Sequence, residues 1–469
     1  MKRVYILFLT IILSLQFGCQ KYLDIQPKGY LIPSTVEDYE RILNNRDLQW
    51  SISTTLDILS DDSYIWSVEP PNIPVNSTNQ AYQWSEDIFL TASELQDYSF
   101  YNRLYENIYQ YNAIINNIDN ATGGTLSRKI IAKAKAKVLR AFSFWYLVNL
   151  YAKQYNNLTA SADLGIPLIM GTDLNQEIPG RGTVQQDFDF ILSEINESIP
   201  LLPTSGSNLF DLDQRGAYGI LARIYLSMEN YPEAGKAAGE VLARNNTLVD
   251  YNSYYATYNN RGLTFIYMSS TSPFSTGQSP EDIFIRYYNS SRGMAGNGIA
   301  QSVVNLFPDN DLRRVSLTPE SVWTATPGVS TGNYYYMYYI LYQYSIGITV
   351  PEMYLIRAEA NARAGNIAAA LNDVNTLRRY RIKTSEYQEI TASTETEAVQ
   401  TVLLERRKEL LFKGARWFDM RRLNADPVYG FTPRHYFADG TFVELMPNSN
   451  RYVLRFPQSA VQQGITQNP

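Results

Sequence analysis

Histidine and cysteine, the side chains that most often bind transition metals or act in nucleophilic catalysis, are almost missing from this sequence. Its 469 residues include one cysteine, Cys19, and one histidine, His435. A single cysteine excludes an intramolecular disulfide, and a zinc site rich in cysteine or histidine is excluded as well. A catalytic triad could use only His435, which lies in a Pro-Arg-His-Tyr run without a matching serine motif. We therefore expect no metal site, and we interpret His435 as a structural residue at the surface or in the core.

The sequence also lacks an excess of basic residues. It has 40 lysine and arginine residues against 46 aspartate and glutamate residues, which gives a formal net charge of −6. Proteins that bind nucleic acids need a basic surface, so we expect no nucleic-acid partner. Hydrophobic residues make up 45% of the chain, which is enough for a sizeable core and argues against global disorder.

Tyrosine is the residue that is present in excess, with 37 copies. Some of these rings must line surfaces. Aromatic faces that carry a hydroxyl group suit the recognition of sugars or peptides. The length of the chain allows two or three domains, or one large helical domain with insertions.

The N-terminus has the features of an exported protein. A short basic start precedes an apolar stretch at residues 4–17. This stretch is shorter than a membrane-spanning helix and typical of a signal peptide, which we assign to residues 1–18. A small residue before the lone Cys19 resembles a lipoprotein cleavage site. We expect Cys19 to be the lipidated N-terminus, with residues 19–33 as a tether; the alternative is an ordinary secretory signal with an incidental cysteine.

Apolar residues recur with helical spacing over most of the chain. Segments 214–243 and 351–380 each place small and large apolar residues around a tight turn, which is typical of tetratricopeptide-like helix pairs. Segments 98–150 and 395–423 are looser versions of the same pattern. We therefore predict a mostly α-helical fold in which four helix pairs form a superhelical scaffold.

Local capping signals predict two further helices. Residues 34–44 have the pattern of a first helix, with Ser34 or Thr35 as its N-cap. Thr183 and Gln186 have the spacing of a capping box, which predicts that another helix begins there.

Two long segments, 45–97 and 246–348, are rich in turn-forming and aromatic residues. Binding residues often collect in such loops. Within the second segment, residues 258–270 and 281–288 alternate in the manner of short strands.

Acidic residues in these segments are interpreted as structural. Asp61 and Asp62 could be catalytic carboxylates or calcium ligands, but two neighbouring acids alone do not make a site. We interpret them as part of a solvated turn or a helix cap. Between Asp311 and Arg314, an arginine beside an aspartate is expected to tie a loop.

The stretch Glu405 to Leu423 (ERRKELLFKGARWFDMRRL) mixes charged residues with apolar rings. A helix that begins near Ala398 is predicted to end or bend at Gly414. Trp417 is too apolar for a free surface and should lie in the core. The arginines should form bidentate pairs with carboxylates against packed rings. We favour this structural interpretation over an active site, because the stretch supplies no nucleophile and no metal site.

The same stretch carries a family resemblance. The pattern E-R-R-x-E-L-x-F-x-G-x-R-W-F-D-x-R-R resembles the C-terminal signature of the SusD/RagB family. The start C-x-x-Y-L-D-x-x-P-K-G at residues 19–29 and the terminal Q-N-P are similar to that family as well. The resemblance implies an N-terminal part at 34–245 with helix pairs one and two, a loop-rich insertion at 246–348, and a C-terminal part at 349–469 with pairs three and four.

The resemblance also implies a function. Family members are outer-membrane lipoproteins that capture nutrients, mostly glycans, for a SusC-type TonB-dependent transporter. It implies no catalysis and no cofactor, and a lipid anchor that faces the outside. The repeat face is taken to meet the transporter, and the loop-rich face the ligand. An oligosaccharide is the ligand that we expect, and a peptide, as for RagB-like members, is the alternative. A helical-repeat adaptor and a polysaccharide hydrolase are less favoured alternatives.

The ligand platform is expected on aromatic residues of the two long segments. Sugars present apolar C–H faces, for which flat aromatic rings beside amides and hydroxyls are suitable receptors. Trp50 and Trp145 lie beside or inside predicted helices and are expected in the core. The predicted platform consists of Trp66, Trp84 and Trp323, with Tyr64 and Tyr335 as further candidates.

Overall fold

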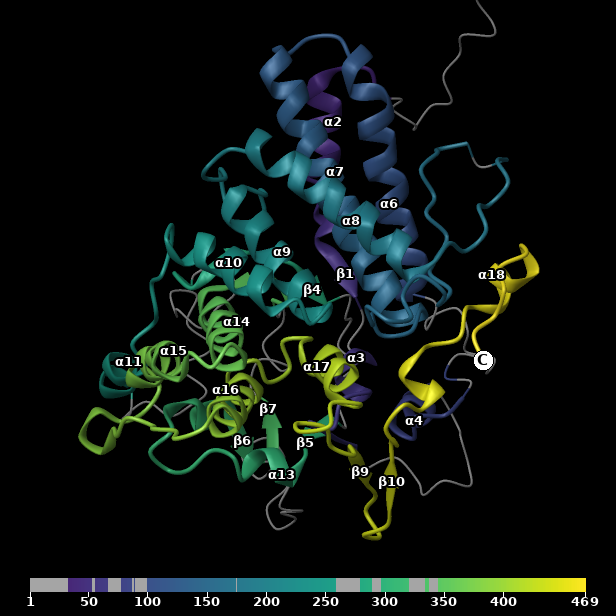
Figure 1. The fold of residues 1–469 in the computed structure, drawn as a ribbon. Coiled ribbons are helices and arrows are strands. Elements are labelled where there is room, and N and C mark those ends of the chain that lie inside the picture. The colour runs from purple at the N-terminus through teal and green to yellow at the C-terminus, as the bar shows by residue number, and fades with distance from the viewer. Residues whose placement is uncertain are drawn as a thin grey trace, which may run out of the picture.

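The structure is a computed structural model, and it describes residues 33–52, 55–65, 77–86, 88, 99–173, 175–258, 279–288, 297–319, 334–336 and 345–469. The signal peptide, Cys19 and most of the tether lie outside these residues. Helices dominate the described part, so the prediction of a mostly α-helical fold is confirmed (Figure 1). Within the described ranges, no helix combines the length and the hydropathy that crossing a membrane requires.

The helices begin and end close to the predicted positions. The longer ones are α2 (Val36–Leu43), α6 (Ser99–Asn117), α7 (Leu126–Tyr151), α8 (Val184–Ser198), α9 (Gln214–Ser227), α10 (Tyr231–Leu242), α11 (Tyr251–Tyr258), α14 (Val350–Arg363), α15 (Ile367–Arg379), α16 (Glu395–Glu409) and α17 (Arg416–Leu423). The short ones are α3 (Thr55–Ile58), α4 (Ser77–Tyr82), α13 (Gln301–Val304) and α18 (Gln458–Gln462).

Local capping explains where several helices begin. Thr35 caps α2 through a capping box with Asp38, and Thr183 caps α8 through the predicted box with Gln186. A third box, between Thr394 and Glu397, begins α16 three residues before the predicted start. Gly414 has a φ of +66°, which glycine adopts without strain, and it separates α16 from α17 as predicted.

Both helices of each predicted pair are present, as α6/α7, α9/α10, α14/α15 and α16/α17, and in the first three pairs the two helices pack on each other. They succeed one another from the α6, α7 and α8 end of the molecule, through α9 and α10, to α14, α15 and α16 (Figure 1). Helix α10 packs on α14, and α14 packs on α16. The N- and C-terminal parts therefore share one scaffold, although the loop-rich insertion separates them in sequence.

Small residues permit this close packing. A compact apolar cluster joins α14, α15 and α16 and contains Ala358, Ala362, Ala370, Val374, Ala398, Val399 and Val402. A larger core joins the remaining helices and the C-terminal segment, and it includes Trp145 and Trp417, both fully buried as predicted. Gly219 of α9 lies so close to Ile348 that an added Cβ would be 2.2 Å from it.

The strands are short and come mainly from the two long segments. A four-stranded sheet has the order β2 (Ser63–Ile65), β5 (Asn297–Ile299), β7 (Tyr334–Tyr336) and β6 (Leu317–Pro319). Three two-stranded sheets pair β1 (Trp50–Ile52) with β4 (Tyr287–Tyr288), β3 (Asp282–Phe284) with β8 (Ile348–Thr349), and β9 (Arg434–Tyr436) with β10 (Phe442–Glu444). The β1–β4 pair and the four-stranded sheet tie residues 50–65 to the insertion.

One of the two predicted stretches of strand alternation lies in the described part of the chain. The predicted alternation at 281–288 corresponds to β3 and β4, whereas most of 258–270 lies outside the described residues. No strand forms at residues 451–457, which all lie within the described part of the chain. A 3-10 helix, Asn450–Tyr452, leads into an extended segment that pairs with no strand. Its hydrogen bonds go instead to the end of α7 and to the terminal side chains.

Candidate ligand-binding site

Asp61 and Asp62 lie under α16 and α17 and are buried, so the prediction of a solvated turn is wrong. Arg416 donates to both oxygens of Asp61 at 2.6 and 2.9 Å, and Arg407 donates to Asp62 at 2.8 Å. Burial would raise the pKa of Asp61, but the Arg407 and Arg416 guanidinium groups hold it well below its usual value. These carboxylates serve as counter-ions that tie α17 to the loop after α3.

The other arginines of this stretch form similar pairs. Arg406 contacts Asp419 at 2.9 Å, and Arg422 forms a bidentate pair with Glu359 at 2.6 and 2.8 Å. The Arg416 guanidinium lies 4.6 Å from the centre of the Phe431 ring. The prediction of bidentate pairs against packed rings is therefore confirmed.

The loop between Asp311 and Arg314 is tied in the same way. Arg313 donates to both oxygens of Asp311 at 2.9 and 2.7 Å, and it also contacts Glu409 at 2.9 Å. Among the described residues, no group of three or more histidine, cysteine, aspartate and glutamate side chains is placed to hold a metal ion.

His435 holds the β9–β10 hairpin against the N-terminal part. Its ring lies between those of Tyr82 and Trp84, with centroids 4.1 and 4.0 Å away and nearly parallel planes. Its two ring nitrogens lie 2.5 and 2.7 Å from the carbonyl oxygens of Tyr82 and Ser60. Burial lowers the pKa of His435. The interpretation of His435 as a structural residue is confirmed, and its place is the core.

Trp84 is therefore not part of an exposed platform. Its side chain is 2% exposed, and its indole N–H donates to the Leu59 carbonyl at 2.9 Å. The turn-rich sequence around it suggested exposure, but His435, distant in the chain, covers its ring. We remove Trp84 from the predicted ligand-contacting residues.

The remaining predicted residues divide into two groups. Trp66 and Trp323 lie outside the described residues. Tyr64 is half-buried on β2, and Tyr335 lies on β7. The structure brings these two strands into one sheet, with β5 between them. Tyr64 pairs with Gly298 of β5, and Tyr335 pairs with Thr318 of β6.

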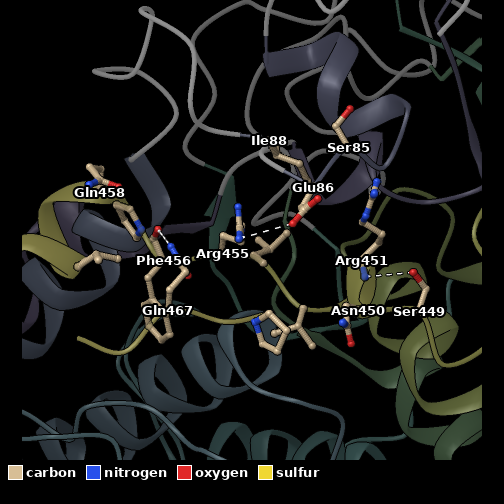
Figure 2. A pocket seen from close by; sticks show the side chains of 15 residues that line it. Ser85, Glu86, Ile88, Ser449, Asn450, Arg451, Arg455, Phe456, Gln458 and Gln467 are labelled. Atoms are coloured by element: carbon tan, nitrogen blue, oxygen red, sulfur yellow. Dashed lines mark hydrogen bonds and ion pairs between the residues drawn. The ribbon is translucent and has the colours of Figure 1, made fainter. Parts of the chain in front are cut away.

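A cavity of about 520 Å³ lies between the segment after α4 and the C-terminal segment. Figure 2 shows Arg455 and Glu86 at its middle, with Phe456, Gln458 and Gln467 to one side and Ser449, Asn450 and Arg451 to the other. Ile88, Val453, Leu454 and Val461 add apolar surface. The volume falls within the range of small-molecule sites, roughly 300–1,000 Å³. We call this space the C-terminal cavity.

The wall of the C-terminal cavity is fixed by hydrogen bonds of terminal side chains. Gln467 accepts from the Phe456 N–H at 2.7 Å and donates to its carbonyl at 2.9 Å. Asn468 donates to the carbonyls of Leu454 and Tyr151, at 2.8 and 2.7 Å. The Phe456 ring stacks on Tyr151, with centroids 5.1 Å apart. The Q-N-P terminus thus holds the cavity wall on the end of α7.

Comparisons with known proteins agree with this architecture. A family model described as "Starch-binding associating with outer membrane" matches residues 21–226, and the model of the SusD family matches residues 348–469. Together these ranges cover more than half of the chain. The chain belongs to the SusD/RagB family.

Individual relatives are distant in sequence. A curated relative, SusD-like protein P25 of Formosa agariphila, is 22% identical over 250 residues, which are 49% of this chain and 44% of that protein. This match thus spans less than half of the relative's length.

Solved structures share the whole fold. A SusD superfamily protein from Bacteroides thetaiotaomicron has a TM-score of 0.73 at 21% identity, and the match covers 93% of this chain and 100% of that chain. Surface glycan-binding protein A from Bacteroides uniformis has a TM-score of 0.70 at 16% identity, with coverage of 92% and 98%. At these identities the likeness establishes the fold alone.

The family is generally one of non-catalytic, carbohydrate-binding proteins associated with the outer membrane. The residues of the C-terminal cavity were not among the predicted site residues. Only a weak signal in the sequence marks them, namely that Arg451 and Arg455 stand four residues apart near the C-terminal end. Glu86, which faces them, is distant in sequence and could not have been paired with them in advance.

Proposed function

We propose that this protein is a non-catalytic outer-membrane lipoprotein that binds oligosaccharides and delivers them to a SusC-type TonB-dependent transporter. The observation that carries the proposal is the SusD/RagB fold across the chain, with family matches in both of its parts. The helix pairs form the scaffold that would meet the transporter. Loops and short strands from the two long segments would form the ligand face.

The ligand platform is proposed on Trp66, Trp323, Tyr64 and Tyr335. Tyr64 and Tyr335 lie on strands of the same small sheet, which supports a common binding face. An aromatic ring can stack on the apolar face of a sugar, and the tyrosine hydroxyl can bond to a sugar hydroxyl. A peptide ligand remains the alternative occupant of this face.

Cys19 is the proposed site of lipidation and would anchor the protein to the outer membrane, facing the outside. It follows an apolar stretch with the length of a signal peptide. A lipid anchor would place the ligand face close to the transporter.

Calorimetry on the purified full chain tests this proposal. Neutral oligosaccharides and short peptides are titrated into the wild type and into the Trp66→Ala, Trp323→Ala and Tyr64→Ala variants. We expect oligosaccharide binding, and a loss of about 1–3 kcal/mol for each ring that contacts the ligand.

Tyr380→Ala is the matched control, because Tyr380 is an exposed ring at the end of α15, outside both long segments. Melting temperatures should stay close to the wild-type value for all variants. Binding of peptides alone would contradict the oligosaccharide proposal. Wild-type oligosaccharide affinity in all three variants would place the platform elsewhere.

A further inference from the structure

We propose that the C-terminal cavity is a second ligand site, which takes the anionic group of an acidic oligosaccharide. The group would be a uronate carboxylate or a sulfate ester, since both present oxygens in a geometry that guanidinium groups bind. This inference rests on the proposed function, because it narrows the class of oligosaccharide. The site is separate from the aromatic platform on β2 and β7.

The charges of the cavity support an anionic ligand. Its lining includes three ionisable side chains, the acidic Glu86 and the basic Arg451 and Arg455. The chain as a whole has a net charge of −6. With two arginines against one glutamate, the side chains of the lining have a formal charge of +1, and such a local excess of positive charge in an acidic protein favours an anion.

Arg451 is the better anion-binding group of the two. It is exposed, and its guanidinium donates from one nitrogen to the Trp84 carbonyl at 2.6 Å. Within the described part of the chain, it forms no ion pair with a carboxylate. Most of the arginines in the Glu405–Leu423 stretch are neutralised by buried acids, so Arg451 differs from them. Its remaining N–H groups are available to a ligand.

Arg455 forms an ion pair that is more exposed than those of the buried arginines. Its guanidinium lies 3.5 Å from a carboxylate oxygen of Glu86, and the two side chains are 30% and 56% exposed. Exposed ion pairs contribute at most about 1 kcal/mol, so a ligand anion can compete with Glu86 for this arginine. Figure 2 shows this pair between the Phe456 side and the Arg451 side of the cavity.

The neutral lining suits the rest of an acidic sugar. Asn450 and Gln458 are exposed and offer amide groups for hydroxyls, while the partly exposed Val453 and Val461 offer apolar surface for C–H faces. An acidic sugar presents hydroxyls next to each anion, which matches this mixture of guanidinium, amide and apolar groups. An acidic peptide can also pair with these amides through its backbone groups, so the choice of a sugar rests on the proposed function. The bonds of Gln467 and Asn468 hold the wall in place before a ligand arrives.

The test is calorimetry of the purified full chain at low and high salt with four probes. These are a galacturonic acid tetramer, a sulfated carrageenan tetrasaccharide, neutral maltotetraose and a glutamate tetrapeptide. The variants are Arg451→Gln and Arg455→Gln, which keep polarity while removing the charge. Arg434→Gln is the matched control, because Arg434 is an exposed arginine that pairs with Glu444 on the β9–β10 hairpin, outside the cavity lining.

We expect one or both acidic sugars to bind the wild type, more weakly at high salt. Arg451→Gln and Arg455→Gln should each weaken that binding by at least about tenfold, as loss of a charged hydrogen bond does. Arg434→Gln should leave it within about twofold, as expected of a distant surface charge. Which acidic probe binds will separate carboxylate from sulfate recognition.

Unchanged affinity of both cavity variants for the acidic sugars would overturn the inference, as would a loss seen only with the glutamate peptide. Binding of maltotetraose but of neither acidic sugar would overturn it and leave the proposed function standing. Failure to bind any of the three sugars would count against both.

Discussion

At the scale of single residues, Asp187 of α8 is a buried carboxylate that forms no ion pair with another described residue. Its side chain is fully buried, and one oxygen accepts from the Ile166 N–H at 2.8 Å. The other oxygen has no hydrogen-bond partner in the described part of the chain. Burial raises the pKa of Asp187 to about 7, although the nearby charge of Arg181 lowers it in part.

This environment makes folding stability depend on pH. The folded pKa is raised above the unfolded value, so the contribution of Asp187 is fully present below about pH 4 and is lost as the pH rises to about 7. In Asp187→Asn, the amide oxygen can still accept from the Ile166 N–H, and the charge is removed. The free energy of unfolding of wild type relative to Asp187→Asn should fall between these pH values by several kcal/mol, as about 1.4 kcal/mol per pKa unit implies.

Urea unfolding at a series of pH values measures this difference, and the Asn variant is itself the control for all other titrating groups. If this difference in the free energy of unfolding did not change from acidic to neutral pH, the folded pKa of Asp187 would not be raised. The carboxyl would then be ionised in the folded protein at neutral pH.

At the scale of elements, α17 is fixed by interactions with parts of the chain that are distant in sequence. Arg416 pairs with Asp61, and Arg421 donates to the Ala152 carbonyl at 2.8 Å. Burial without a carboxylate partner lowers the pKa of Arg421 to about 9. Trp417 is 1% exposed and packs beside Tyr452. The helix therefore joins the N-terminal loop, the end of α7 and the C-terminal segment.

Removing either the packed Trp417 ring or the Arg416 guanidinium should destabilise the fold. Trp417→Ala should cost about 3–5 kcal/mol through the cavity that it leaves. Arg416→Ala should cost a similar amount, roughly 3–5 kcal/mol, because it leaves Asp61 buried without this partner. Arg434→Ala is the control for a surface ion pair and should cost about 1 kcal/mol or less. Chemical denaturation of the three variants measures these losses in the free energy of unfolding and shows whether the first two exceed the third.

A different result would change the interpretation of this stretch. If Arg416→Ala melted like wild type but lost ligand binding, the charged stretch would be a binding site and not a structural element.

Contacts between residues near in sequence were predictable, whereas contacts between distant segments were not. Helix starts were predictable because caps are local: Thr183 and Gln186 are three residues apart. The partner of Arg416 was not, because Asp61 lies 355 residues away, and only the folded chain brings them together. The prediction that Trp84 is exposed was wrong for the same reason, because the residues that cover it are distant in sequence. Its neighbours in sequence indicate a loop, whereas its neighbours in space are His435 and the Leu59 carbonyl.

The candidate site was less predictable than the scaffold. Periodicity identified the four helix pairs, since each pair is formed by a continuous segment. The C-terminal cavity combines Glu86 with residues 449–469, and no periodic pattern marks such a combination. The proposed aromatic face likewise depends on strands β2 and β7, whose pairing through β5 is a property of the tertiary structure.

At the scale of the whole molecule, attachment through Cys19 is the first consequence to test. Cys19→Ala should release the protein from the outer membrane, because acyl chains contribute about 0.8 kcal/mol for each buried CH₂ group. Membrane fractionation should be done in cells that lack the transporter, so that a protein partner cannot retain the variant. Retention of Cys19→Ala in the membrane fraction of such cells would indicate another anchor.

A non-catalytic binding protein should bind an oligosaccharide and leave it intact. The most direct measurement incubates the purified full chain with each oligosaccharide that binds in calorimetry, and then determines the length of the recovered sugar by mass spectrometry. We expect saturable binding and recovery of the sugar at its original length. Shortened products that appear with the purified protein, and not with buffer alone, would contradict it and identify a hydrolase.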